Sequence, residues 1–373
     1  RVRSSAASDV YKRQILWIVG GTSLVFSLLH PQRQSPETSI TYSWQKRLDH
    51  FLTASVFWHD NMLRAVTNWT LLTGGNRVGN VYLSQERLLE RPAVLDSKQM
   101  TETAGLLYTF YQTSQIPMCV IAVPAASELY ADATVGGAPC PSQLEAIDSF
   151  YQALPTQIRK IDAYHVLLNG TEDYIYNRTD PRWTCYGAYS VYRSAIQKMG
   201  FAPISYDQFV VNHADTFRGS LYQTCLYEKV MPDILDVYTC SSGSQITEMT
   251  ALLPDDTEEA RSLYQMPSDA DDPYDYYLGG ECDKLEIQTD LNNGKKLLLI
   301  KDSNADCMVP FLLQHYSELA AVDIEDTSRP LGELVDVSAY SQVLVLCDAD
   351  TLADSQLFLD LFSAETRGEG EYD

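Results

Sequence analysis

Two short segments of this chain hold residue types that could perform acyl transfer together. The first is Asp180-Pro181-Arg182-Trp183, in which a carboxylate is followed by a basic and an aromatic residue. The second is Ser303-Asn304, which follows an apolar run. A serine at a turn between a strand and a helix can expose its hydroxyl for attack on a carbonyl carbon, and free N–H groups at the helix start can stabilise the oxyanion. Ser303 is therefore a candidate nucleophile, although a serine that only caps the helix fits the same pattern.

The first segment does not offer a base for this serine. A serine nucleophile needs a neighbour that accepts its proton near neutral pH, as imidazole does. Arg182 stays protonated, so it can pair with Asp180 or bind an anionic substrate group, but it cannot act as a general base. Asp180 has an alternative role as a buried partner of Arg182 or as a loop cap.

No histidine of the sequence is an obvious substitute. His315 follows Ser303 on an expected helix, roughly 18 Å along the axis at about 1.5 Å per residue, so we expect a packing or capping role. His165 lies in an apolar, strand-like segment and is expected to be a core histidine, whereas His213 lies in a loop-rich region that could fold over the site. The remaining histidines precede the folded core: His30, His50 and His59.

The elements that must position the two segments alternate between helix and strand. A helical pattern over 101–113 leads into a continuous apolar strand over 117–124, and further apolar strands are expected over 295–301 and 342–347. Fully apolar strands that alternate with helices predict an α/β fold with a mostly parallel sheet covered on both faces. Ligands of such sheets bind beyond the carboxyl ends of the strands, which is where Ser303 is expected.

Composition and charge limit the possible domain organisation and partners of the chain. With 373 residues, of which 45% are hydrophobic, the chain can bury a large core, and we favour one large domain over 44–365. A formal net charge of −23, without a basic stripe, excludes nucleic acid as a partner. A weaker apolar rhythm over 201–281 predicts a loop-rich insertion, in which tyrosines near 274–277 either stack on sugars or belong to a solvated loop.

The ends of the chain differ from its middle. Residues 1–14 resemble translated sequencing adapter and are treated as a non-native leader. The apolar run at 15–30 predicts a signal anchor or transmembrane segment, with a buried core helix as the alternative, and 31–43 form a linker. We therefore expect a single N-terminal membrane anchor that carries an extracytoplasmic domain. Residues 366–373 form a polar tail.

The eight cysteines show neither a CxxC pair nor zinc-ligand spacing, so we expect no metal and no other cofactor. Cys119 and Cys347 lie in apolar strands and are expected to be buried thiols. A disulfide between Cys225 and Cys240 is a candidate bridge in an exported chain.

The region around the first segment resembles the signature of the bacterial DHHW protein family, which is related to alginate O-acetyltransferase-like members of the SGNH hydrolase superfamily. The resemblance rests on Tyr176-Asn177-Arg178-Thr179-Asp180-Pro181-Arg182-Trp183-Thr184 with Gly187-Ala188-Tyr189 and Tyr192. Further matches occur in order over roughly 78–360: Val123-Pro124, Phe217-Arg218-Gly219-Ser220-Leu221-Tyr222, Pro232-Asp233, and Lys301-Asp302-Ser303 through Val309-Pro310-Phe311-Leu312 to His315-Tyr316.

The resemblance implies a three-layer, SGNH-like (flavodoxin-like) fold with Ser303 as nucleophile and Asp180 orienting a histidine base. Arg182 stands where that base is expected, and Pro181 also departs from the family's first histidine. The substrate contacts that we expect are Trp183, Asn304 and Tyr189. The alternative for Trp183 is a core aromatic residue.

Two functional hypotheses follow. The chain is either an acyltransferase or esterase that acts on cell-surface polysaccharide, with an acyl donor as its second partner, or a non-catalytic relative that binds glycans or an envelope partner. Arg182 favours impaired catalysis. An error in the sequence around Pro181 and Arg182 is a third explanation of the altered motif.

Overall fold

The computed structural model describes residues 59–131, 141–268, 270 and 272–363. The chain divides into two units, Arg1–Thr73 and Gly74–Asp373. In the first unit the described element is helix α3 (His59–Leu72), and the predicted leader, anchor, linker and C-terminal tail lie outside the described residues. None of the helices in the described ranges has the length and apolar character needed to cross a membrane.

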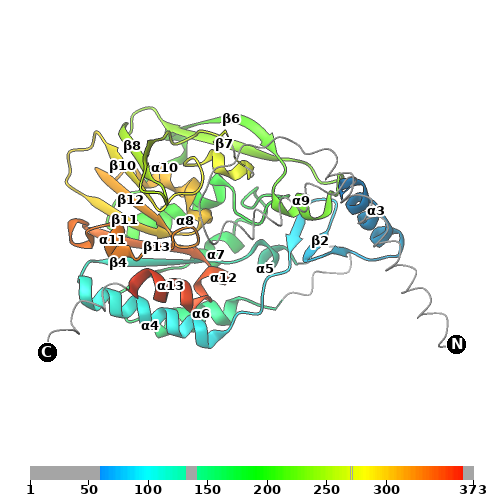
Figure 1. Cartoon of the computed structure of the whole chain (residues 1–373), viewed down its shortest axis with the longest axis horizontal. Helices are drawn as coiled ribbons and strands as arrows, with labels where there is room; N and C mark the ends of the chain where they lie inside the picture. The colour runs from blue at the N-terminus through cyan, green and yellow to red at the C-terminus, as the bar shows by residue number, and fades with distance from the viewer. Residues whose placement is uncertain (1–58, 132–140, 269, 271, 364–373) are drawn as a thin grey trace. The chain divides into compact units, whose positions relative to one another are not determined.

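A large mixed sheet forms the centre of the second unit (Figure 1). Its strands in spatial order are β5 (Arg159–Ile161), β4 (Met118–Val123), β13 (Gln342–Asp348), β11 (Lys296–Lys301), β12 (Glu318–Asp323), β10 (Lys284–Thr289), β8 (Ile246–Leu252) and β9 (Glu258–Ala260). The strands from β5 to β12 pair in parallel, whereas β10, β8 and β9 continue the sheet in antiparallel fashion. The predicted α/β class with a mostly parallel sheet is confirmed.

The order of the parallel strands has a particular feature. The last strand in sequence, β13, lies between β4 and β11 instead of at an edge, unlike the simple flavodoxin order. Because β13 is central, its residues 343–347 are buried on both faces, which explains their continuous apolar sequence.

Helices cover both faces of the sheet in three layers (Figure 1). One face packs against α4 (Ser97–Ser114), α6 (Leu144–Ala153) and α13 (Ser355–Phe362), and the other against α8 (Cys185–Lys198) and α10 (Val309–Leu312). Successive residues of one strand join opposite cores, since Leu298 belongs to the first and Leu299 to the second.

Local sequence signals define the first of these helices. Asp96 caps α4 by accepting a hydrogen bond from the backbone N–H of Lys98, and the helix ends where Gln115 adopts a left-handed conformation with φ of 55°. Its buried face includes Phe110, whose ring stacks on that of Phe362 from α13 with centroids 4.7 Å apart.

The remaining elements surround the sheet. A small antiparallel sheet contains β1 (Arg77–Val78), β2 (Val81–Leu83) and β3 (Leu88–Glu90), and β6 (Phe209–Phe217) pairs with β7 (Asp233–Cys240). The short helices are α5 (Ala126–Tyr130), α7 (Ala163–Leu168), α9 (Ser220–Cys225), α11 (Leu331–Leu334) and α12 (Ala349–Leu352), with 3-10 turns η2 (Tyr206–Gln208), η3 (Pro273–Tyr276), η4 (Ser303–Met308) and η5 (Val337–Ala339).

Several details differ from the sequence expectations. The region 201–281 contributes β8 and β9 to the main sheet, which the weak apolar pattern of these strands did not indicate. The segment around His165 is a helix, because Asp162 ends the preceding strand region and caps α7 by accepting from the His165 N–H. The helix expected over 307–319 is instead η4 followed by α10, which ends at Leu312.

The candidate disulfide between Cys225 and Cys240 does not form. Cys225 and Cys240 are both buried free thiols, as are Cys119 and Cys347. The expectation of buried thiols at Cys119 and Cys347 is therefore confirmed. Cys140 lies outside the described residues.

Gly187 of α8 packs closely against the chain segment that precedes the helix, so we expect a larger residue there to destabilise the fold. A Cβ at position 187 would overlap the backbone carbonyl oxygen of Ile175, and backbone cannot yield cheaply. We expect Gly187→Ala to lower the free energy of unfolding by about 3 kcal/mol. Gly105→Ala is the control, because Gly105 lies on the exposed face of α4, where a Cβ meets open space. This variant should raise the free energy of unfolding by up to about 1 kcal/mol. Equal effects in urea denaturation would contradict this packing.

Candidate active site

A cleft of about 220 Å³ lies where the sequence placed it, at the carboxyl ends of the parallel strands. Chain segments that follow β4, β11, β12 and β13 line it, and β3 contributes Glu90. The side chains that matter for its chemistry are Glu90, Ser127, Arg182, Asp272, Asp302, Ser303, Asn304, Glu325, Asp348 and Asp350. The two segments predicted to act together, with Arg182 and Ser303, therefore share one cleft.

Asp233 shapes the segment that carries Arg182. Its buried carboxylate accepts hydrogen bonds from the backbone N–H of Arg178 at 2.6 Å and of Thr179 at 2.7 Å. The hydroxyls of Tyr174 and Thr179 also donate to it. Burial raises the pKa of Asp233, while these donors oppose that rise. The role of Asp233 depends on contacts across the chain, so only its place in the family resemblance pointed to it.

Asp180 and Arg182 form a buried, two-pronged ion pair. The Nε atom of Arg182 donates to Oδ1 of Asp180 at 2.7 Å, and an NH2 group donates to Oδ2 at 2.8 Å. The backbone N–H of Arg182 also donates to Oδ1 at 3.1 Å. Asp180 is fully buried and Arg182 is 8% exposed, so solvent screens the pair weakly. This geometry matches the alternative role of Asp180 as a buried partner of Arg182.

The opposite side of Asp180 is closed by the start of α9. The backbone N–H of Ser220 lies 3.4 Å from Oδ2 of Asp180. Gly219 allows this approach, because an added Cβ would overlap the Asp180 side chain. Asp180 is thus held both by Arg182 and by the start of α9.

Asp272 and Tyr274 hold the guanidinium of Arg182 from other directions. An NH2 group of Arg182 donates to Asp272 at 2.6 Å, and its Cζ atom lies 3.9 Å from the ring centroid of Tyr274. Burial lowers the pKa of Arg182, but Asp180 and Asp272 outweigh burial and raise that pKa well above its ordinary value. Arg182 is therefore cationic at every accessible pH and cannot accept a proton.

Ser303 begins the 3-10 helix η4, directly after the buried strand β11. The helix cap is Asp302, whose Oδ1 accepts from the Asn304 N–H at 2.9 Å, so the alternative of Ser303 as the N-cap is wrong. The Ala305 N–H donates to the Asp302 carbonyl oxygen. These contacts occupy two N–H groups expected to be free for an oxyanion. In the described part of the chain, no side chain is hydrogen-bonded to the Ser303 hydroxyl.

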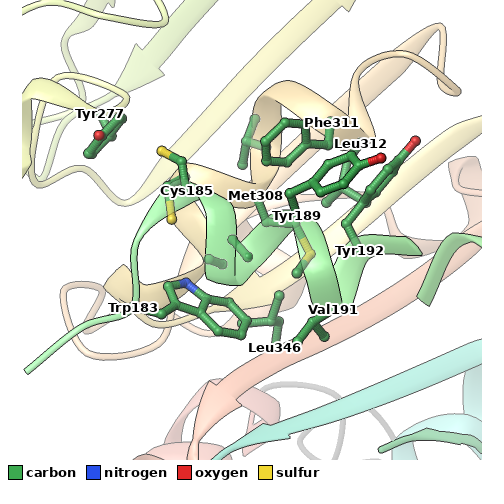
Figure 2. Packing of buried hydrophobic residues seen from close by; sticks show 14 of the residues in the cluster. Trp183, Cys185, Tyr189, Val191, Tyr192, Tyr277, Met308, Phe311, Leu312 and Leu346 are labelled. Atoms are coloured by element: carbon green, nitrogen blue, oxygen red, sulfur yellow. The ribbon is translucent and has the colours of Figure 1, made fainter. Parts of the chain in front are cut away.

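Two predicted substrate contacts are core residues instead. Trp183 is fully buried, and its Nε1–H donates to the backbone oxygen of Asn304 at 2.5 Å. Tyr189 is also buried, and its hydroxyl donates to the backbone oxygen of Ile204. Figure 2 shows both side chains within the hydrophobic cluster around α8. The core alternative for Trp183 is correct, and Asn304 is the predicted substrate contact that does line the cleft.

The described histidines do not line the cleft. His315 is buried beyond the end of α10, and its Nε2 lies 2.7 Å from the Tyr192 hydroxyl. Because that hydroxyl accepts from the Ile204 N–H, we assign it as donor to a neutral His315. Burial lowers the pKa of His315 to about 4. His165 is exposed on α7 and not in the core, and exposed His213 pairs with Asp236.

The cleft is strongly acidic. Burial raises the pKa of Asp350 to about 7, with further contributions from Asp348 and Glu90. The pKa of Asp302 is raised well above its ordinary value by burial and by Asp348. These carboxyl groups were not singled out in the sequence, because acidic residues are common throughout it. Within the described ranges, no cluster of His, Cys, Asp and Glu has the arrangement of a metal site.

Comparisons with known proteins find one matching family model and several solved structures of similar fold. The family model described as "DHHW protein" matches residues 111–322. Among solved structures, a DHHW family protein from Eubacterium siraeum has a TM-score of 0.63 at 19% identity, covering 76% of this chain and 98% of that protein. PatB1 of Bacillus cereus, solved with a sulfonyl adduct, has a TM-score of 0.61 at 16% identity over 75% and 97%.

A weaker structural match is the O-acetyltransferase domain of Pseudomonas putida AlgJ, with a TM-score of 0.46 at 14% identity over 77% of this chain and 100% of that domain. No curated protein matches the sequence. At these identities the solved structures show the fold alone, an α/β fold that this chain shares with the DHHW family protein and PatB1.

Removal of the Arg182 side chain should show how much its buried pair with Asp180 contributes to the free energy of unfolding. In Arg182→Met, the carboxylate of Asp180 stays buried without its partner, which should lower the free energy of unfolding by roughly 3–5 kcal/mol. Lys98→Met, which removes the exposed pair with Glu102, is the control and should cost at most about 1 kcal/mol. Urea denaturation measures both. Similar small losses would show that the Asp180–Arg182 pair is not stabilising its loop.

His315 should also make stability depend on pH. Its folded pKa of about 4 lies below the ordinary value of 6.5, so the unfolded chain binds the extra proton between these values. Stability is therefore complete above pH 6.5 and decreases as the pH falls towards 4, by about 3 kcal/mol in total. Buried carboxyl groups act in the opposite direction, so wild type and His315→Gln must be compared. Parallel stability curves for the two proteins would refute this assignment.

Proposed function

The chain belongs to the DHHW protein family, and we propose that this member is a polysaccharide-binding envelope protein in which serine acyl transfer has been disabled at Arg182. The fold is that of SGNH-like acetyltransferases, so an acyl-transfer site is the expected ancestral chemistry of the cleft. The observation that carries the proposal is the Asp180–Arg182 ion pair beside Ser303.

Catalysis by Ser303 needs a proton acceptor in contact with its hydroxyl. Arg182 occupies the position after Pro181 where the family resemblance implies that base, and its charge is balanced by Asp180 and Asp272. A carboxylate such as Asp350 could accept a proton in principle, but the described contacts do not place one on the Ser303 hydroxyl. These contacts support a cleft that keeps the serine and its turn but has no base in contact with the Ser303 hydroxyl among the described residues.

Binding does not require the missing base. The cleft retains its volume, its polar walls and its position at the carboxyl ends of the strands, which are the properties of a ligand site in such folds. Polysaccharide as the ligand follows from the resemblance to alginate O-acetyltransferase-like proteins. A location outside the cytoplasmic membrane is part of the same proposal and rests on the apolar run at 15–30 of the sequence.

An aryl sulfonyl fluoride, which modifies activated serines, tests the catalytic part of this proposal. We expect no labelling of the wild type, because nothing removes the Ser303 proton. Arg182→His should gain labelling that Arg182→His with Ser303→Ala lacks, since imidazole next to Asp180 recreates a base. Mass spectrometry of intact protein and of the peptide that contains Ser303 measures the result.

Labelling of the wild type at Ser303, abolished in Ser303→Ala alone, would contradict the proposal and restore the acyltransferase or esterase hypothesis. Ser190→Ala is a matched control, because Ser190 lies on α8 with its hydroxyl bonded to the Tyr186 carbonyl oxygen. This variant should behave as the wild type in every assay.

A further inference from the structure

The charges on the cleft walls are unusually one-sided. Carboxylate side chains come from Glu90, Asp272, Asp302, Glu325, Asp348 and Asp350, and the described lining residues include one cation, Arg182. Arg182 is already balanced by Asp180 and Asp272. The other carboxyl groups of the cleft therefore have no cation to balance them among the described lining residues.

Among the described residues, the carboxylates of Glu90, Glu325 and Asp348 accept hydrogen bonds from uncharged donors only. Glu90 accepts from the Asn80 amide, Glu325 from the Thr351 hydroxyl, and Asp348 from the Thr351 N–H. Within the described ranges none of these carboxylates, nor Asp350, forms an ion pair with a Lys, Arg or His side chain. Like charges that are partly buried together raise one another's energy, and a ligand cation would relieve this repulsion.

A second observation is independent of the charges. Ser127, in α5 at the end of β4, is 1% exposed and lines the cleft. Its hydroxyl has no hydrogen-bond partner among the described residues. One carboxylate oxygen of Asp350, also on the cleft wall, lacks a partner as well. Buried polar atoms without a protein partner are rare in folded proteins, and a bound ligand or an ordered water commonly supplies the partner.

We propose that this cleft binds a carbohydrate that carries a protonated amine, an amino sugar without its N-acyl group, through Asp350, Glu325 and Ser127. This inference rests on the proposed polysaccharide-binding function and specifies its ligand class. An ammonium group donates up to three hydrogen bonds, which suits carboxylates that already hold neutral donors. A uronate polymer, by contrast, would bring negative charge to a negative cleft.

The ligand class is tested by calorimetric titration of the full chain with three tetrasaccharides: a β-1,4-glucosamine tetramer, its fully N-acetylated form and a uronate tetramer. We expect the glucosamine tetramer to bind at least about 10-fold more tightly than the N-acetylated one, with an affinity that falls as salt is added. The uronate tetramer should not bind. EDTA in every titration excludes a metal bridge.

Variants connect the binding to named side chains. Asp350→Asn and Glu325→Gln should each weaken binding of the glucosamine tetramer about 10-fold and leave the N-acetylated tetramer unaffected. Glu258→Gln, which makes the same charge change on exposed β9, is the control and should bind as the wild type. Ser127→Ala should weaken binding about fivefold while thermal stability stays equal or rises, because an unpartnered hydroxyl is removed from the free protein.

The outcomes separate the two proposals. If the N-acetylated or the uronate tetramer binds as tightly as the glucosamine tetramer, the amine-binding inference is wrong and polysaccharide binding stands. If none of the three binds, the carbohydrate-binding function fails together with it. Loss of binding in Glu258→Gln equal to that in Asp350→Asn would show a general charge effect and overturn the assignment to the cleft.

Discussion

The site depends on the buried pair between Asp180 and Arg182. A carboxylate without solvent needs a partner of matching geometry, and the planar guanidinium supplies one for both oxygens. The same contact engages both carboxylate oxygens of Asp180. It also places a permanent cation in the same cleft as Ser303. A single residue therefore holds the loop together and stands at the position where the family resemblance implies a base.

The frame around this pair does not depend on catalysis. Asp233 fixes the backbone of the motif segment, and the Trp183 indole joins that segment to the turn of Ser303 through the Asn304 carbonyl oxygen. Because these are core contacts, the geometry of the cleft does not depend on which residue stands at position 182. Fold and activity are separable here, and the function has to be argued from the side chains of the site.

The acidity of the cleft favours cationic ligands. Carboxylates such as Asp348 and Asp350 are costly to keep close together at partly buried positions, as the raised pKa of Asp350 shows. Folded proteins tolerate such a cost mainly at functional sites. The unpartnered hydroxyl of Ser127 adds to that cost in the free protein. Both features would be relieved by one bound cation with hydrogen-bond donors.

The sequence by itself determined the α/β class, the place of Ser303 after a buried strand and the absence of a base at Arg182, because apolar periodicity and the chemistry of a side chain are local properties. Only the tertiary structure decided that Trp183 is a core residue, that Asp233 braces the motif and that β8 extends the sheet. These results depend on contacts between residues far apart in the chain. No local pattern reports which distant groups will share a buried space.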